Sequence, residues 1–370
     1  MATQIITSCV LLVVAGLLVR GLHRILTTDL GYDYKHAVVI DPQLYAHAYT
    51  QVKAVGYMRD LQARVARAPG VESSALATVV PLGNRIWGGG QFESDSGAKV
   101  HVYLNAVSPN YFKTLAIPIL RGRDFNENET GVVIVSESFA RKMWSGKDPL
   151  QQTFTWQKKK LPVVGLSGNA RTVALRDREG VELYFAAVDS DLTSAAMLVR
   201  TSRSPDAMSS LLRGLVRPLD PVLSPNVYAL HFAFDDRISD TKKMASVVSG
   251  MGGLALLLAL VGLYGVVSYT VTQRTKEIGI RMALGASRSK IVQTIASRFL
   301  LPVSLALIAG VGVAALLSII LRSQLFGMSN FDPLSYAAAI VALIATGILA
   351  SALPARRALR VDPVEALRCD

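Results

Sequence analysis

Residues 244–273 read MASVVSGMGGLALLLALVGLYGVVSYTVTQ, an apolar run without any Asp, Glu, Lys or Arg. A membrane-spanning helix needs about 20 mainly apolar residues, so this run is long enough to cross a bilayer. Further uncharged runs occupy residues 1–19, 299–321 and 333–355. Together with a hydrophobic content of 51% and a mean hydropathy of +0.36, they predict an α-helical membrane protein with four transmembrane helices.

The first run is the weakest of these predicted spans, because polar residues such as Thr3, Gln4 and Thr7 dilute its start. A cleaved signal peptide is the alternative. The sequence favours an uncleaved span, since no basic region precedes the apolar run and no A-x-A-like cleavage site follows it.

The placement of charge predicts the orientation more clearly than the net charge of +12 does. Residues 273–298 carry many Lys and Arg against a single acid, Glu277, and the tail after residue 355 is rich in Arg. Residues 323–332 contain neither Lys nor Arg. Short loops rich in Lys and Arg stay in the cytoplasm, so residues 20–243 and 323–332 are expected outside.

One cluster opposes this orientation. Arg20, His23 and Arg24 follow the first run and are therefore expected on the external side. The conflict indicates that cytoplasmic residues once preceded Met1. The three other spans determine the orientation that we predict, with the N-terminus inside.

These patterns predict the division of the chain. Its two cysteines, Cys9 and Cys369, lie outside the large external domain, which must be held by its own core. In order, we expect transmembrane helix 1 at 1–22, the external domain at 23–243, helix 2 at 244–272, a cytoplasmic loop at 273–297, helix 3 at 298–322, an external loop at 323–332, helix 4 at 333–354 and a cytoplasmic tail at 355–370.

The external domain is predicted to be α+β. Strand, helix and strand patterns follow one another over 37–43, 47–68 and 72–83, and again over 195–202, 205–216 and 226–232. Two such β-α-β units are the components of a ferredoxin-like sandwich. We expect this lobe over about 30–83 and 193–233, with a strand-rich lobe inserted over about 84–192; one continuous sheet is the alternative. Residues 234–248 are expected to continue as a helix into the second span.

Small residues recur at every fourth position of the third and fourth spans. Such ridges let helix backbones approach closely in lipid. Alanine is common in spans, so a single ridge carries little weight, but two favour helix packing. The expected packing residues are Ala306, Gly310, Ala314, Ser318, Ala338, Ala342, Thr346 and Ala350.

Signals of enzyme chemistry are weak. The five histidines form no HExxH motif or close pair, so we expect no metal site and no cofactor. Lys147 follows a glycine, but Arg141 stands where a phosphate-binding loop needs another glycine. The spans contain no Asp, Glu, Lys or Arg that would form a hydrophilic relay. We expect no enzyme activity, no ATP site within the chain and no nucleic-acid partner.

The stretch QRTKEIGIRMALGASRSK, residues 273–290, predicts a short basic helix from Lys276 to Leu284. Glu277 and Arg281 are spaced as an i,i+4 pair, and the apolar Ile278 and Met282 share one face. Gly285 suits the position that ends a helix. Composition alone favours an interfacial helix that rests on anionic lipid, with docking on a cytoplasmic partner as the alternative.

Several motifs resemble one family. QRTKEIGIRMALGAS (273–287) and PARRALRVDPVEALR (354–368) resemble the cytoplasmic segments of MacB/FtsX-type ABC transporter permeases. Residues 107–125, 133–154 and 163–171 resemble the MacB-like periplasmic core domain of the same family. The resemblance covers nearly the whole chain, which looks most like the second half of a duplicated permease. It departs from the family at the N-terminus, where family members carry a cytoplasmic stretch before the first span.

The resemblance implies that the basic helix is a coupling helix engaged by a separate ABC ATPase subunit. It also implies a second permease unit, as a homodimer or heterodimer, and a porter-like role for the ferredoxin-like lobe. The coupling residues that it implies are Arg274, Lys276, Glu277, Ile278, Ile280, Arg281, Met282 and Gly285.

The function implied is that of a multi-pass permease subunit in the bacterial inner (plasma) membrane. It would couple ATP hydrolysis by a separate subunit to motion of the periplasmic domain, for efflux or export. The lipid bilayer and a periplasmic adaptor are further expected partners. The alternatives are a non-transporting scaffold that regulates an envelope enzyme and a truncated half-permease without autonomous function.

Overall fold

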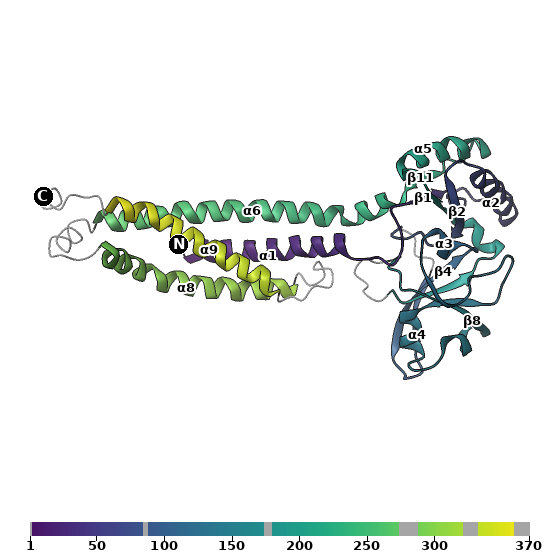
Figure 1. Cartoon of the computed structure of the whole chain (residues 1–370), viewed down its shortest axis with the longest axis horizontal. Helices are drawn as coiled ribbons and strands as arrows, with labels where there is room; N and C mark the ends of the chain where they lie inside the picture. Colours follow the sequence, from purple (N-terminus) through teal and green to yellow (C-terminus); the bar gives the residue numbers. More distant parts are fainter. Residues whose placement is uncertain (1, 84–87, 174–179, 274–287, 321–331, 359–370) are drawn as a thin grey trace, which may run out of the picture. The chain divides into compact units, whose positions relative to one another are not determined.

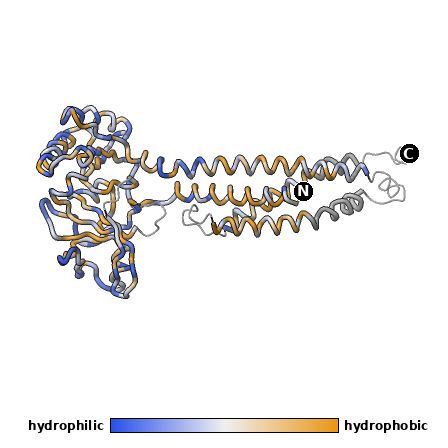
Figure 2. Tube along the Cα trace, turned by 180° about the vertical axis from the view of Figure 1, so that it is seen from behind, coloured by the Kyte–Doolittle hydropathy of each residue, from blue (hydrophilic) through white to orange (hydrophobic). Residues whose placement is uncertain are grey.

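The computed structural model describes residues 2–83, 88–173, 180–273, 288–320 and 332–358. The chain divides into two compact units (Figure 1). We call residues 28–238 the sheet unit, and residues 1–27 with 239–370 the helical unit. Helices long and apolar enough to cross a membrane contain Ala2–Thr27, Leu230–Thr270, Val303–Ile320 and Pro333–Ala350. Figure 2 shows the hydrophobic stretches of these helices in orange. The predicted combination of four apolar helices and an α+β domain is confirmed.

The first lobe of the sheet unit has two β-α-β segments, which alternate in the sheet. Its strands lie in the order β11-β1-β10-β2, and each neighbouring pair is antiparallel. This interleaving is the ferredoxin-like arrangement. Its elements are β1 (Ala37–Asp41), α2 (Gln51–Ala66), β2 (Val71–Ala77), β10 (Ala196–Thr201), α5 (Pro205–Val216), η3 (Arg217–Leu219) and β11 (Asn226–Ala229).

The second lobe continues the sheet in the order β4-β9-β6-β8-β5, with β3 paired to β4 and β7 paired to β8. Its strands are β3 (Gly88–Glu93), β4 (Lys99–Val107), β5 (Ile119–Gly122), β6 (Val133–Ser136), β7 (Thr153–Trp156), β8 (Lys159–Ser167) and β9 (Glu182–Ala186). Its helical elements are α3 (Tyr111–Thr114), α4 (Glu137–Met143), η1 (Pro149–Gln151) and η2 (Asp189–Thr193). Helix α4 begins where the Ser136 hydroxyl accepts a hydrogen bond from the Phe139 amide, as an N-cap does.

The two lobes share one sheet but have separate cores. Residues such as Ile40, Met58 and Leu212 fill one core, and Phe139 and Leu183 belong to the other. Strands β2 and β4 are joined by the single pair Ala77–Val107.

Side chains strengthen this narrow joint between the lobes. The buried Asn105 accepts from the Val79 amide at 3.0 Å and donates to the Val79 carbonyl at 3.0 Å. The Thr78 hydroxyl accepts from the Ala106 amide at 3.0 Å. These bonds satisfy main-chain groups that would otherwise be buried without partners.

The described part of the helical unit contains α1 (Ala2–Thr27), α8 (Arg288–Ile320), α9 (Pro333–Ala358) and the portion of α6 (Leu230–Gln273) that follows Ile238. Half of the α1 span is buried, against less than a third of each other span, so α1 is the central helix. Cys9, Val13 and Leu17 from α1 form a core with Ala314 of α8 and Ala339 of α9.

Helix α6 begins earlier than the sequence indicates. The predicted strand over 226–232 is wrong in its last residues, because β11 ends at Ala229 and α6 begins at Leu230. Leu230 is buried within the sheet unit, which explains why a strand-like apolar pattern continues into the helix.

Candidate functional site

The small-residue ridge of α8 lies against α1. Ala306, Gly310, Ala314 and Ser318 are all buried. A Cβ placed on Gly310 would lie 2.8 Å from the Cys9 Cβ, so the two helices approach as closely as a glycine allows. Small residues at this spacing are what such close packing requires.

The buried face of α9 differs from the predicted ridge. Thr346 and Ala350 are buried, but Ala342 is half-buried and Ala338 is exposed in this chain. Ala339 takes the buried position instead. A strict four-residue spacing drifts around a helix of 3.6 residues per turn, so the ridge leaves the contact face toward its N-terminal end.

One hydrogen bond and one close approach hold α1 against its neighbours. The Ser8 hydroxyl donates to the Ala255 carbonyl of α6 at 3.0 Å. In the middle of α1, a Cβ on Gly16 would lie 3.2 Å from the Ser335 Cβ of α9. Neither contact is predictable from the sequence, because neither Ser8 nor Gly16 belongs to a repeated small-residue pattern.

The segment that follows α1, residues 28–36, is held firmly within the sheet unit; we call it the strap. Leu30 and Tyr32 are buried. Gly31 has a φ of +78°, and a Cβ there would lie 1.9 Å from the Asn169 carbonyl oxygen, so only glycine fits. The Asp33 amide donates to the Leu115 carbonyl at 2.7 Å.

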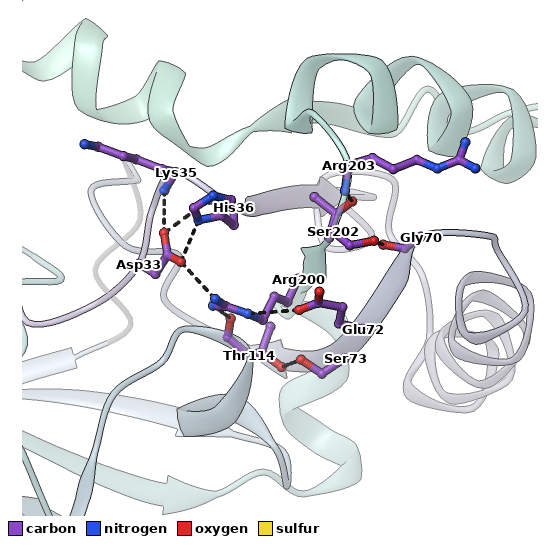
Figure 3. A network of polar contacts seen from close by, with 11 residues as sticks. Asp33, Lys35, His36, Gly70, Glu72, Ser73, Thr114, Arg200, Ser202 and Arg203 are labelled. Atoms are coloured by element: carbon purple, nitrogen blue, oxygen red, sulfur yellow. Dashed lines mark hydrogen bonds and ion pairs between the residues drawn. The ribbon is translucent and has the colours of Figure 1, made fainter.

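Asp33 connects the strap to the sheet (Figure 3). Its carboxylate accepts a hydrogen bond from Arg200 Nη2 of β10 at 3.0 Å and lies 2.8 Å from His36 Nδ1. Arg200 Nε lies 3.3 Å from Glu72 Oε2 of β2. Burial raises the pKa of Asp33, but the His36 ring, the Lys35 amide and the Arg200 charge outweigh it and hold that pKa below its ordinary value.

The first turns of α6 are anchored to the same unit. Arg237 donates to the Leu82 carbonyl at 3.0 Å and to the Gly83 carbonyl at 2.7 Å. The Phe234 ring stacks on Tyr34 of the strap with centroids 4.8 Å apart. The two chain segments that connect the sheet unit to apolar helices therefore contact each other.

The implied coupling residues Arg274, Lys276, Glu277, Ile278, Ile280, Arg281, Met282 and Gly285 lie outside the described residues. Within the described residues, no group of three or more His, Cys, Asp or Glu is placed to hold a metal ion. The described residues provide packed helices and two connections anchored to the sheet unit.

Known families match both parts of the chain. The profile of the MacB-like periplasmic core domain matches residues 5–212, and that of the FtsX-like permease C-terminal domain matches residues 249–363. The apolar helices, the sheet unit and the two family matches together define a membrane protein with an external domain. The chain belongs to the MacB/FtsX-type family of ABC transporter permeases.

Curated relatives agree with this assignment. The macrolide export ATP-binding/permease protein MacB of Neisseria meningitidis is 25% identical over 283 residues, which cover 72% of this chain and 43% of that protein. MacB of Hahella chejuensis is 27% identical over 292 residues, with the same coverage. MacB of Shigella boydii is 40% identical over 119 residues, 31% of this chain and 18% of that protein. The chain thus spans less than half the length of the first two relatives.

Solved structures also align with the chain. The periplasmic region of MacB from Actinobacillus actinomycetemcomitans aligns with a TM-score of 0.35 at 15% identity, over 60% of this chain and 98% of that one. The extracellular domain of the transporter YknZ aligns with a TM-score of 0.30 at 17% identity, over 48% of this chain and 92% of that one.

Proposed function

We propose that this permease subunit couples ATP hydrolysis by a separate ABC ATPase to motion of its external domain, and that this motion drives export. A second permease unit would pair with it in the membrane. The export direction is supported by the MacB relatives, which are macrolide exporters by name. The proposed location is the bacterial inner membrane.

The observation that carries the proposal is the uninterrupted helix α6. It contains 44 residues, which at 1.5 Å per residue makes it about 66 Å long. The hydrocarbon core of a bilayer is only about 30 Å thick. The helix must therefore extend well beyond the membrane, and it does so as the same helix that begins in the sheet unit.

Both ends of α6 suit a lever. At its start, Phe234 and Ile238 are buried and Arg237 bonds two main-chain carbonyls. At its end, Gln273 directly precedes the segment proposed as the coupling helix. A push on that segment would pass along a stiff rod to the sheet unit.

The coupling role is tested with Ile278→Ala combined with Met282→Ala. If these side chains form the buried anchor of an ATPase contact, their loss should cost about 2 kcal/mol or more, roughly thirtyfold in affinity. The measurement is recovery of the ATP-binding subunit with the full chain from detergent, at matched membrane levels.

The matched control is Leu257→Ala with Val261→Ala, which removes an exposed apolar pair of the same spacing from α6. This control should retain the ATP-binding subunit. Equal recovery with the test and control variants would show that the 276–284 helix rests on lipid and does not couple.

A further inference from the structure

An ion pair joins the end of α1 to the start of α9. Arg20 Nη1 donates to both carboxylate oxygens of Asp332. The Asp332 side chain is only 13% exposed, whereas that of Arg20 is 43% exposed. The two residues are 312 positions apart in the chain, so the contact is purely tertiary.

The Asp332 carboxylate also accepts hydrogen bonds at the start of α9. Its Oδ2 accepts from the Ser335 amide at 3.0 Å and from the Ser335 hydroxyl at 2.6 Å. Asp332 is thus the N-cap of α9, and Pro333 occupies the first helical position. The carboxylate that fixes where α9 begins also holds α1.

Close packing continues one turn further into the bundle. Gly16 of α1 approaches Ser335, as described above, and the Tyr336 hydroxyl donates to the Ser318 hydroxyl of α8 at 3.4 Å. The shared core with Cys9 and Ala339 lies beyond. Helices α1, α8 and α9 are therefore connected at this end by charge, capping and packing together.

Helix α6 meets this group differently. Its buried positions Ala245, Gly252 and Ala259 form a narrow seam at seven-residue spacing, which the larger Leu263 and Val267 continue toward the end of the helix. A Cβ on Gly252 would find Leu12 Cδ2 at an ordinary 3.5 Å. Large side chains of α6 outside the seam, among them Leu254 and Val261, are exposed in this chain. The Ser8–Ala255 hydrogen bond joins α6 to α1 without the charge that reinforces the contact of α1 with α9.

We infer that Arg20 and Asp332 are positioning residues that latch α1 to α9, so that α1, α8 and α9 move as one body. The role of this latch in force transmission rests on the proposed function. In the predicted orientation Arg20 lies at the external end of its span, and Asp332 provides a partner for its charge there.

The geometry of the ion pair predicts which side chains at position 20 can preserve it. A single nitrogen of Arg20 makes both bonds, so Arg20→Lys, with its single amine, should preserve the latch. Arg20→Gln lacks the charge and should open it. Asp332→Asn keeps an oxygen for the α9 cap but loses the ion pair, and should also open it.

The test uses a cysteine pair, Gly16→Cys with Ser335→Cys, in full-length protein whose Cys9 and Cys369 are replaced by Ser. The Gly16 Cβ position lies 3.2 Å from the Ser335 Cβ, and disulfides need about 3.5–4.5 Å, so a small adjustment suffices. Losing a charge-assisted hydrogen bond of this kind should slow oxidative cross-linking at least about tenfold.

We expect slow cross-linking with Arg20→Gln and with Asp332→Asn, no further loss when the two are combined, and full rates with Arg20→Lys. His23→Gln, on the same helix, is the control and should cross-link normally. Rates that do not change with Arg20→Gln, or that stay low with Arg20→Lys, would overturn the latch without affecting the proposed function.

A second measurement uses the oxidised pair in the complex with the recovered ATP-binding subunit. If α1 and α9 stay together throughout the cycle, the disulfide should leave ATP hydrolysis unchanged. Loss of hydrolysis in the oxidised protein, restored on reduction, would show that the contact must open and would overturn the inference.

Discussion

Replacing Gly310 by leucine should separate α8 from α1. A Cβ at this position lies 2.8 Å from Cys9 Cβ, 3.2 Å from Cys9 Sγ and 3.4 Å from the Ile6 Cα. Because the backbone fixes the position of the Cys9 Cβ, rotation of a side chain cannot relieve the 2.8 Å clash. The leucine would add three further carbons beyond the Cβ, so the helices must move apart.

The size of the effect follows from overpacking. Extra carbons in a well-packed core typically cost about 1–3 kcal/mol, which shifts an opening equilibrium by roughly 5- to 150-fold. Gly312→Leu is the matched control, because a Cβ on Gly312 meets nothing within 4 Å and lies in the same helix. The change in helix propensity is the same at both positions and cancels.

Cys9 provides the assay. Its side chain is 0% exposed, so its thiol should react with a small membrane-permeant maleimide only when the helices open. With Cys369 replaced by Ser, labelling should be roughly 5- to 150-fold faster in Gly310→Leu than in the parent, and unchanged in Gly312→Leu. Equal labelling rates in the two variants would refute the close α1–α8 contact.

Three further predictions concern the sheet unit and the topology. Asn105→Ala should lower the free energy of unfolding by about 1–3 kcal/mol, because a buried main-chain amide and carbonyl lose their partner; an unchanged unfolding midpoint would contradict this. The hydrogen bond to Asp220 raises the pKa of Tyr49 to about 12 in the folded protein, above its ordinary value of about 10. The free energy of unfolding that this bond contributes should therefore be fully present below about pH 10 and be lost as the pH rises toward 12. The Tyr49→Phe variant should not lose stability over this pH range. If its free energy of unfolding fell with pH as that of the parent does, the role of the Tyr49–Asp220 hydrogen bond would be refuted. A cysteine at Lys158 should react with an impermeant reagent in intact cells and one at Ser287 should not; the reverse result would invert the orientation.

The membrane architecture was predictable because it depends on local chemistry. A run such as 244–273 must avoid charge throughout, and helix α2 must end before Pro69 and Gly70, which interrupt it. The ferredoxin-like lobe follows from two β-α-β patterns whose strands are apolar and whose helices are bounded by Pro or Gly.

The rest depends on contacts between distant residues. Nothing near Arg20 in the sequence indicates Asp332, although both were expected at the external side and adjoin apolar runs. The joint through Ala77 and Val107 likewise depends on how two lobes meet. Ala339 rather than Ala338 is buried because the contact face follows the helical period and not a repeat of four.

The proposed function requires α6 to act as a rigid lever between the membrane and the sheet unit. Asp240→Pro should break it, since proline removes one helical hydrogen bond and clashes with the preceding turn, at a cost of about 3 kcal/mol. Asp240→Ala is the control: both variants lose the same exposed ion pair with Lys243, in which Asp240 is 97% exposed.

The decisive measurement is the distance between spin labels at Lys158 in the sheet unit and Val313 in α8, with and without trapped ATP, in the complex with the recovered ATP-binding subunit. We predict an ATP-dependent change of distance in Asp240→Ala and none in Asp240→Pro, with the ATP-binding subunit retained in both. The same change of distance in Asp240→Pro would contradict the lever.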